Sequence, residues 1–223
     1  MQIRIPYTPR KFQNYLHQRI KDYRWSVLVC HRRFGKTVCM INHLLMAALT
    51  SKVSNPRYAY IAPTFKQAKS IAWDYIKQFT HKIPGVKFNE TELRVDLPNK
   101  ARITLLGSEN CDGLRGIYLD GCVIDEYANV NDRLFPEIIR PALSDRKGFC
   151  IFIGTPQGMN NNFYELFQHA KGADDWFYFK AKASETKVVD QDELSKAEQI
   201  MGENKFKQEF ECDWIANIEG AIY

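Results

Sequence analysis

The stretch Cys30-His31-Arg32-Arg33-Phe34-Gly35-Lys36-Thr37 decides the fold, because it ends in the Gly-Lys-Thr of a phosphate-binding loop. An apolar run, Trp25-Ser26-Val27-Leu28-Val29, precedes it and predicts a buried strand, and the following segment, residues 38–49, is compatible with a helix. In this context backbone N–H groups cradle phosphates, the lysine reaches the β and γ oxygens and the Thr hydroxyl binds magnesium. We therefore expect the residues from His31 to Thr37 to bind a nucleotide, with Lys36 also catalytic and Thr37 a metal ligand.

The loop departs from the usual pattern at its first and central positions. Cys30 stands where the pattern has a glycine, and Arg32 and Arg33 occupy positions that are often small or neutral. Gly-Lys-Thr alone also occurs by chance, so a nucleotide site requires a second motif elsewhere in the chain.

The second motif is Gly121-Cys122-Val123-Ile124-Asp125-Glu126, in which apolar residues lead into two carboxylates. Such a pattern predicts a buried strand whose C-terminal end opens on an active site. Asp125 is expected to hold magnesium, directly or through water, and Glu126 to polarise the water that attacks a γ-phosphate. Alone, the pair would equally fit a strand that ends in two solvated acids. Together with the loop it predicts hydrolysis of ATP.

A third apolar run, Phe149-Cys150-Ile151-Phe152-Ile153, stops at Gly154-Thr155-Pro156. In ATPases that use a catalytic Glu after the Asp, a further strand lies between the loop strand and the Asp-Glu strand. The tip of that strand then faces the γ-phosphate, so Thr155 is expected to bind the nucleotide and to sense this phosphate. A Gly-Pro turn that merely closes a strand is the alternative.

Composition and length limit which classes of protein the chain can belong to. The 223 residues suffice for one substantial core and a small appendage, and 45% of them are hydrophobic. A net charge of +5 permits a polyanionic partner without requiring one. No apolar run approaches the roughly 20 residues that span a bilayer, and the N-terminus does not resemble a signal peptide, so no membrane association is expected. Six cysteines without a Cys-x-x-Cys indicate a reducing cytoplasm, with neither a zinc site nor a disulfide framework.

Strands and helices alternate along the chain, which predicts an α/β fold with a mainly parallel sheet flanked by helices. We expect a P-loop ATPase core over residues 1–171 and a small lid subdomain over residues 172–223. Further expected elements are a strand at 57–61 followed by a helix, a hairpin of 92–97 with 101–106, a helix at 133–143 interrupted by two prolines, and a strand at 176–180.

The order of these motifs resembles that of the ATPase domain of the large terminase subunit of tailed bacteriophages, the motor that pumps DNA into the capsid. The resemblance covers nearly the whole chain and implies a P-loop NTPase fold of the additional-strand, catalytic-Glu type. The matching pieces are Pro9-Arg10-Lys11-Phe12-Gln13, Arg32-Arg33-Phe34-Gly35-Lys36-Thr37, Ala62-Pro63-Thr64-Phe65-Lys66-Gln67-Ala68, Gly113-Leu114-Arg115-Gly116, Val123-Ile124-Asp125-Glu126, Gly154-Thr155-Pro156-Gln157-Gly158 and Phe206-Lys207-Gln208-Glu209-Phe210-Glu211-Cys212.

The resemblance implies ATP and magnesium as ligands and gives roles to residues outside the common motifs. Arg32 and Arg33 are expected near the phosphates, with Arg32 also catalytic, because a guanidinium offers forked donors and a permanent charge. A surface arginine is the alternative for either. Gln13 is expected to hydrogen-bond the edge of the adenine base, and Gln18 is the other candidate for this role. For both residues the alternative is a solvated side chain on a helix. Tyr7 is a candidate for stacking on the base.

Arg115 lies between two glycines just ahead of the Asp-Glu strand. Members of the resembled family are thought to supply an arginine finger from this segment to the neighbouring subunit of a ring, so a catalytic role is expected for Arg115. The alternative is an arginine that binds carboxylates of its own chain, such as Asp120 or Glu126.

By the same resemblance the partners are double-stranded DNA, a portal protein and a small terminase subunit. The chain is expected to be monomeric in isolation, to form a ring on the portal and to act in the cytoplasm of an infected bacterium. It stops at residues 219–223, about where a linker to a nuclease domain is expected. DNA-contact candidates are Lys66, Lys69, Lys77 and Lys82, although a solvated helix face explains these lysines equally well.

Two other classes of function stay open at this point. Ala62-Pro63-Thr64 and Asp125-Glu126 also fit a helicase-like ATPase, but no second ATPase domain follows. A nucleotide-gated assembly module that does not hydrolyse ATP would have no need for a water-orienting carboxylate at Glu126.

Overall fold

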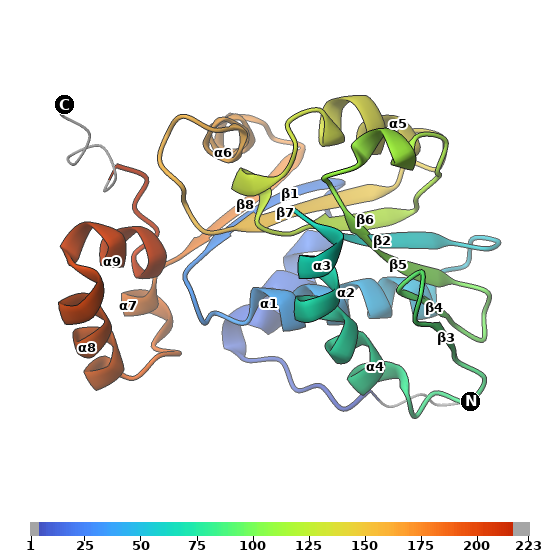
Figure 1. Cartoon of the computed structure of the whole chain (residues 1–223), viewed down its shortest axis with the longest axis horizontal. Helices are drawn as coiled ribbons and strands as arrows, with labels where there is room; N and C mark the ends of the chain where they lie inside the picture. The colour runs from blue at the N-terminus through green and yellow to red at the C-terminus, as the bar shows by residue number, and fades with distance from the viewer. Residues whose placement is uncertain (1–4, 216–223) are drawn as a thin grey trace.

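One mixed sheet runs through the centre of the molecule, with the strand order β3-β4-β5-β2-β6-β7-β1-β8 (Figure 1). The computed structural model describes residues 5–215. From β5 to β8 every neighbouring pair is parallel, and only β3–β4 and β4–β5 are antiparallel. The strands are β1 (Trp25–Cys30), β2 (Arg57–Ala62), β3 (Lys87–Asn89), β4 (Arg94–Asp96), β5 (Arg102–Gly107), β6 (Gly121–Ile124), β7 (Phe149–Gly154) and β8 (Trp176–Ala181).

Helices cover both faces of this sheet, as expected where parallel strands are joined by crossover connections. The helices of the described chain are α1 (Lys11–Ile20), α2 (Lys36–Thr50), α3 (Phe65–Ala68), the π-helix η1 (Lys69–Trp73), α4 (Asp74–Thr80), the 3₁₀-helices η2 (Cys111–Leu114) and η3 (Tyr127–Asn129), the π-helix η4 (Leu134–Ile139), α5 (Arg140–Ala142), α6 (Asn162–Gly172), α7 (Ala183–Thr186), α8 (Gln191–Met201) and α9 (Glu203–Phe210).

Two apolar cores lie on opposite faces of the sheet. In Figure 1 the first helices, α1 to α4, lie below the sheet, and α5 and α6 lie above it. The lower core contains Leu44 and Tyr60, and the upper core contains Phe152 and Phe163. Because side chains alternate along each strand, one strand contributes to both cores.

β7 lies between β1 and β6. Val123 pairs with Ile151 on one side of β7, and Val27 pairs with Phe152 on the other. The additional strand expected between the loop strand and the Asp-Glu strand is therefore confirmed, and with it the α/β P-loop fold. The carboxyl ends of these three strands meet at one edge of the sheet.

The hairpin expected around residue 99 is present, because β4 pairs with β5 in antiparallel register. Residues 134–142 are helical, first as η4 and then as the short α5, which has Pro141 in its first turn. Pro fits the first turn, where its missing N–H has no intrahelical partner.

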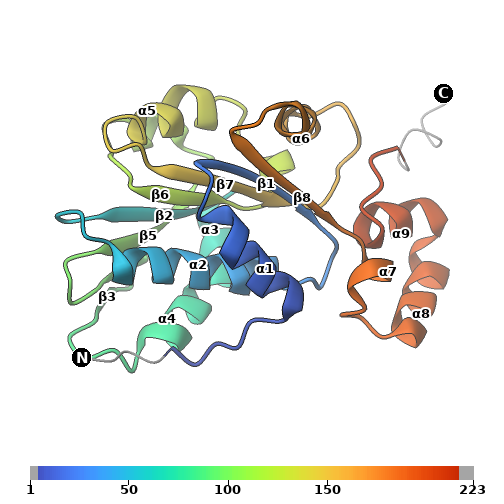
Figure 2. The ribbon, with the colours of Figure 1, turned by 180° about the vertical axis from the view of Figure 1, so that it is seen from behind.

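The domain boundary expected after residue 171 falls before β8. That boundary places β8 in the lid, yet β8 pairs with β1 from Trp176 to Ala181, so it belongs to the central sheet. Beyond it, α7, α8 and α9 form a separate small cluster around Leu194, Phe206 and Phe210. Figure 2 shows these three helices beside the β8 edge of the sheet. The expected linker at 219–223 lies outside the described residues.

All six cysteines are buried and free, and Cys122 and Cys150 approach to 3.4 Å between sulfur atoms across β6 and β7. Within residues 5–215, no helix is both long and apolar enough to cross a bilayer.

Candidate nucleotide site

The loop between β1 and α2 adopts a conformation that its glycine makes possible. Gly35 caps α2 with φ +86°, a left-handed conformation that L side chains rarely adopt. A Cβ at this position would lie 2.6 Å from Nη2 of Arg10 and 2.9 Å from Nε2 of Gln13. The tight turn leaves the first N–H groups of α2 without intrahelical partners, which is the arrangement that binds phosphates.

Lys36 reaches back across this loop. Its Nζ donates to the carbonyl oxygens of Cys30, at 3.1 Å, and His31, at 3.5 Å. Beside it lies a cavity of about 360 Å³ that combines the loop with the Asp-Glu strand. The lining residues are Arg33, Gly35, Lys36, Thr37, Val38, Ser70, Ile71, Tyr75 and Glu126.

Asp125 follows β6 and is 3% exposed. Its Oδ2 accepts a hydrogen bond from Thr37 Oγ1, at 3.5 Å, and a second one from the hydroxyl of Tyr60. Tyr60 pairs with Val123 across β2 and β6, so the side chain of Asp125, two residues further, lies on the same face of the sheet. The backbone N–H of Glu126 donates to the other oxygen, Oδ1, at 2.8 Å.

Burial raises the pKa of both carboxyls at this edge. For Asp125, desolvation is opposed by the hydrogen bond from Tyr60 and by the charge of Lys36; for Glu126, desolvation is opposed mainly by Lys36. A buried carboxylate beside a hydroxyl is the oxygen-rich donor set that magnesium prefers, and a bound cation would offset the cost of burying the charge. Thr37 and Asp125 therefore fit the expected metal site.

Glu126 has φ +47°, which is uncommon for a residue other than glycine. Such strained backbone concentrates at functional sites, where the surrounding structure maintains it. A backbone hydrogen bond from Thr155 lowers the pKa of Glu126. Thr155, which is buried at the end of β7, thus contacts the carboxylate proposed to orient water.

The structure separates the two arginines of the loop. Arg33, with φ +70°, lines the cavity. Arg32 lies towards α9 instead: its Nη1 is 3.9 Å from Oε2 of Glu209, and its backbone N–H donates to the Glu209 carbonyl oxygen at 2.8 Å. The Arg32 side chain is 61% exposed, so it has room to move.

The buried residue Gln13 lies directly behind the loop. Its Nε2 donates to the carbonyl oxygen of Gly35 at 3.2 Å, and its Oε1 accepts from the backbone N–H of Arg10 at 2.9 Å. Adenine recognition by this amide therefore requires these two hydrogen bonds to be exchanged. Gln18 is exposed on α1, and the hydroxyl of Tyr7 lies 3.0 Å from Nε2 of His17.

His31 and Phe34 are buried in the loop. Both ring nitrogens of His31 are engaged, Nδ1 with the carbonyl oxygen of Arg32 and Nε2 with Oγ1 of Thr186. Contact with a nucleotide is therefore left to the backbone of His31.

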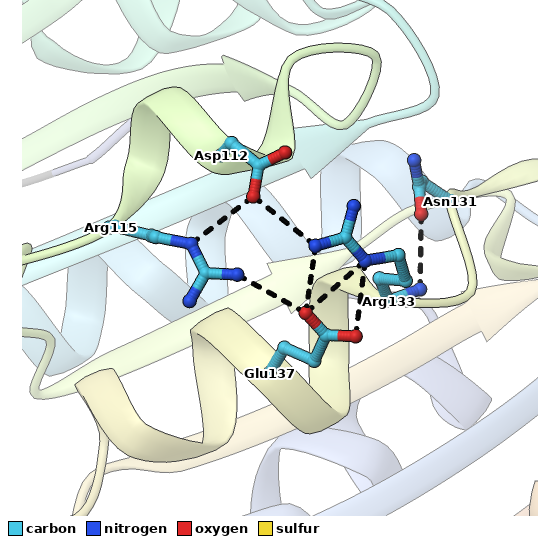
Figure 3. A network of polar contacts seen from close by, with 5 residues as sticks. All are labelled: Asp112, Arg115, Asn131, Arg133 and Glu137. Atoms are coloured by element: carbon cyan, nitrogen blue, oxygen red, sulfur yellow. Dashed lines mark hydrogen bonds and ion pairs between the residues drawn. The ribbon is translucent and has the colours of Figure 1, made fainter.

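Arg115 pairs with carboxylates of its own chain, but Asp120 and Glu126 were the wrong partners to expect. Its Nε lies 3.1 Å from Asp112, and its Nη2 lies 3.2 Å from Glu137. Arg133 contacts the same two acids, which closes the network in Figure 3. The Arg115 side chain remains 54% exposed.

Of the four lysines considered for DNA contact, Lys66, Lys69 and Lys82 are exposed. Lys77 is half-buried and pairs with Asp74 at 3.4 Å and Glu90 at 3.5 Å, so its charge is already matched.

Several site residues escape sequence reasoning. Tyr60 reads as part of an apolar strand, although a hydroxyl two residues before a strand end is a usable signal. Ser70, Ile71 and Tyr75 line the cavity from η1 and α4, and Glu209 contacts the loop from α9. These contacts depend on packing between distant segments, which local patterns do not encode.

A lysine-tipped loop, an additional strand and an Asp-Glu pair at the same sheet edge define a P-loop fold of the catalytic-Glu class. The family model described as "Terminase large subunit, T4likevirus-type, N-terminal" matches residues 29–223. The chain belongs to this family, which confirms the resemblance inferred from its motifs.

Individual relatives agree with this assignment. The chain is 31% identical over 126 residues to the large terminase subunit of Thermus virus P23-45, a match that covers 48% of this chain and 26% of the relative. The large subunit of Thermus phage G20c matches to the same extent. The chain thus spans only about a quarter of the length of these curated relatives.

Solved structures share the fold. The ATPase domain of the large terminase of Thermus phage P74-26 superposes with a TM-score of 0.80 at 21% identity, covering 95% of this chain and 96% of that domain. The large terminase of a thermophilic bacteriophage, solved in complex with ADP, gives a TM-score of 0.79 at 14% identity, over 92% of this chain and 53% of that chain. The large terminase of bacteriophage HK97 gives a TM-score of 0.76 at 16% identity, over 95% of this chain and 51% of that chain.

Proposed function

We propose that this chain hydrolyses ATP and is the ATPase part of a motor that translocates double-stranded DNA into a procapsid. One observation carries the proposal: two motifs far apart in sequence meet at one cavity. Thr37 Oγ1 lies 3.5 Å from Asp125 Oδ2, and Lys36 and Glu126 line the same cavity. The large terminase of the thermophilic bacteriophage described above, which shares this fold, has been solved with ADP and with ATP-gamma-S, and this supports a nucleotide as the ligand.

Each residue has a definite role in this proposal. The N–H groups at the start of α2 bind the phosphates, and Lys36 leaves the carbonyl oxygens of its loop to neutralise β and γ oxygens. Thr37 and Asp125 would hold magnesium, which supplies Lewis-acid polarisation of the phosphoryl oxygens when bound. Glu126 orients the attacking water and accepts its proton; its raised pKa makes it a stronger base than an exposed glutamate.

Arginines and the third strand complete the site. Arg33 faces the cavity, and Arg32 reaches it by leaving Glu209, so both stabilise charge that develops on the transferred phosphoryl group. Thr155 contacts Glu126 from β7 and senses the γ-phosphate. Gln13 reads the adenine edge after exchanging its hydrogen bonds to the loop.

We further propose that Arg115 acts on the neighbouring subunit of a ring. Asp112 and Glu137 keep its guanidinium extended and half-exposed, so it is available to a second subunit. Portal protein and small terminase subunit are the partners implied by the family, and the cytoplasm of an infected bacterium is the site of action. The helices α7 to α9 form the lid, which contacts the phosphate loop through Glu209.

The test compares phosphate release by the parent chain with release by Glu126→Gln, together with the binding of an ATP analogue and magnesium. We expect the variant to bind the analogue as the parent does and to release phosphate at least about 100-fold more slowly, because it lacks the base that activates water. Equal rates of release would contradict the mechanism. Binding without hydrolysis by the parent itself, even in the presence of DNA, would favour an assembly module.

A further inference from the structure

We propose that His31 is a positioning residue that fastens the back of the phosphate loop to the lid through Thr186. This role goes beyond backbone contact with the nucleotide, and it rests on the proposed function, because it concerns how the loop is prepared for ATP.

The imidazole of His31 spans the junction between loop and lid. Its Nδ1 lies 2.6 Å from the carbonyl oxygen of Arg32, and since a carbonyl oxygen only accepts, Nδ1 carries the proton. Its Nε2 lies 2.7 Å from Oγ1 of Thr186, the last residue of α7. In the neutral ring Nε2 is then the acceptor, and the Thr186 hydroxyl donates to it at 2.7 Å rather than to the Ala183 carbonyl oxygen, which lies 3.5 Å away.

The surroundings keep this ring neutral and fixed. His31 has no exposed surface, and Phe34 packs against it edge to face with ring centroids 5.7 Å apart. Burial is the largest cause of its lowered pKa. The hydrogen bond to the Arg32 carbonyl oxygen is the main opposing cause, and the charge of Lys36 adds to the lowering. A neutral imidazole, with one donor and one acceptor at opposite ends of a rigid ring, matches the carbonyl and hydroxyl that it joins.

Two backbone hydrogen bonds run parallel to the imidazole bridge. The N–H of His31 donates to the carbonyl oxygen of Ala181 at 3.1 Å, and the N–H of Arg32 donates to that of Glu209 at 2.8 Å. Cys212 Sγ donates to the same Ala181 oxygen at 3.2 Å. The loop is therefore held from behind by the end of β8, by α7 and by α9, and the imidazole adds a side-chain link to these backbone links.

The expected consequence is preorganisation. A loop already held in its turn does not lose conformational freedom when phosphates bind, so more of the contact energy appears as affinity. One lost hydrogen bond of this kind corresponds to a roughly 3- to 10-fold change in affinity. The nucleotide should bind more weakly without the bridge, while the chemistry at Glu126 proceeds at a similar rate once the loop is filled.

The experiment uses two substitutions at either end of the bridge and a matched control. Thr186→Val removes the hydroxyl and keeps the shape of the side chain. His31→Asn keeps a donor near the position of Nδ1 but does not reach Thr186. Thr80→Val is the control: Thr80, like His31, is fully buried, and its hydroxyl donates to the Ile76 carbonyl oxygen at 2.6 Å within α4. Four quantities are measured for each chain and for the double variant. They are the dissociation constant of a non-hydrolysable ATP analogue in the presence of magnesium, the KM and kcat of ATP hydrolysis, and Tm.

We expect Thr186→Val and His31→Asn each to raise the dissociation constant and KM by about 3- to 10-fold with kcat within about 2-fold. The double variant should bind the analogue no more weakly than the weaker-binding single variant, because both changes remove the same bridge. Thr80→Val should lower Tm without changing either constant.

Two results would overturn the inference. In the first, the Tm of Thr186→Val falls as that of the control does, but the variant binds the analogue as tightly as the parent. In the second, the loss of binding free energy in the double variant equals the sum of the losses in the two single variants. A parent chain that does not bind the analogue would instead contradict the proposed function, so the two failures are distinguishable.

Discussion

Tyr60 of β2 donates its hydroxyl hydrogen to the same Asp125 oxygen that accepts from Thr37. The tyrosine is fully buried, and this hydrogen bond lowers the pKa of an Asp125 carboxyl that burial otherwise raises. It thus favours the ionised form of the carboxyl and holds Oδ2 towards Thr37 at the start of α2. Mutation of a group that orients a metal-binding residue in this way commonly lowers metal affinity by about 10- to 100-fold.

Tyr60→Phe should therefore weaken the response to magnesium. We expect the magnesium concentration that gives half-maximal ATP hydrolysis to rise about 10-fold, because Asp125 loses its orienting donor and its pKa rises further. Tyr58→Phe is the matched control: on the same strand, it removes a hydroxyl that donates to the Ala47 carbonyl oxygen at 3.2 Å. Equal magnesium requirements for the two variants would show that the Tyr60 hydroxyl has no part in metal binding.

Local patterns were sufficient for the elements that bear the motifs. The apolar runs before Cys30, Asp125 and Thr155 predicted three strands, and knowledge of one ATPase class predicted their order in the sheet. The three strands lie side by side in the order β6-β7-β1, and apart from Ser26 their runs are apolar, which suits strands buried on both faces.

Pairing between distant segments was not predictable in the same way. The contact of Tyr60 with Asp125 depends on the register of β2 and β6, and the partners of Arg115 depend on how η4 packs against η2. The strand at Trp176 was predicted correctly, but no local signal indicated that it joins β1 rather than the lid. In each case the position is fixed by packing across the sheet.

Acid should destabilise the protein through a pair of adjacent histidines, of which His43 is buried and His17 is partly buried. Nδ1 of His17 lies 3.2 Å from Nδ1 of His43, and burial lowers their pKa values to about 4 and about 3, respectively. Between pH 6.5 and these values the unfolded chain binds protons that the folded chain does not. As the pH falls through this range, the free energy of unfolding should therefore decrease by up to about 1.4 kcal/mol per pH unit for each histidine.

Urea unfolding between pH 7.5 and 5 measures this loss. The raised pKa values of Asp125 and Glu126 act in the opposite direction, so parent and variant are compared at each pH. His43→Gln should show a shallower fall than the parent, and His81→Gln, at an exposed position, should follow the parent. If His43→Gln loses as much stability in acid as the parent, the histidine pair is not the source.

Gly35→Ala should abolish nucleotide binding. The new Cβ would be strained at φ +86° and would collide with the side chains of Arg10 and Gln13, which lie behind the loop. Gly202→Ala separates the two effects, because Gly202 has φ +76° and no atom within 4 Å of an added Cβ. We expect both variants to lose about 1 kcal/mol or more of stability from backbone strain.

Only Gly35→Ala should also lose affinity for an ATP analogue, as measured by calorimetry. Unchanged affinity in this variant would mean that the loop binds phosphate in a different conformation from the one described.

Complementation between inactive variants tests whether Arg115 serves a neighbouring subunit. Glu126→Gln keeps Arg115 but cannot activate water, whereas Arg115→Ala keeps Glu126 but lacks the guanidinium, whose absence should cost about 10³-fold or more under assembling conditions. In a mixed ring, some interfaces combine an intact Glu126 with an intact Arg115 from the adjacent subunit. Phosphate release by the mixture should therefore exceed that of either variant alone.

Arg133→Ala is the matched control for this experiment, because Arg133 contacts the same two acids, Asp112 and Glu137 (Figure 3). It should retain most of the parent's activity, since the remaining arginine can still pair with both carboxylates. A mixture no more active than its components, under conditions where the parent is active, would mean that Arg115 acts within its own subunit. Loss of activity in Arg133→Ala equal to that in Arg115→Ala would instead assign the effect to the network that both arginines hold together.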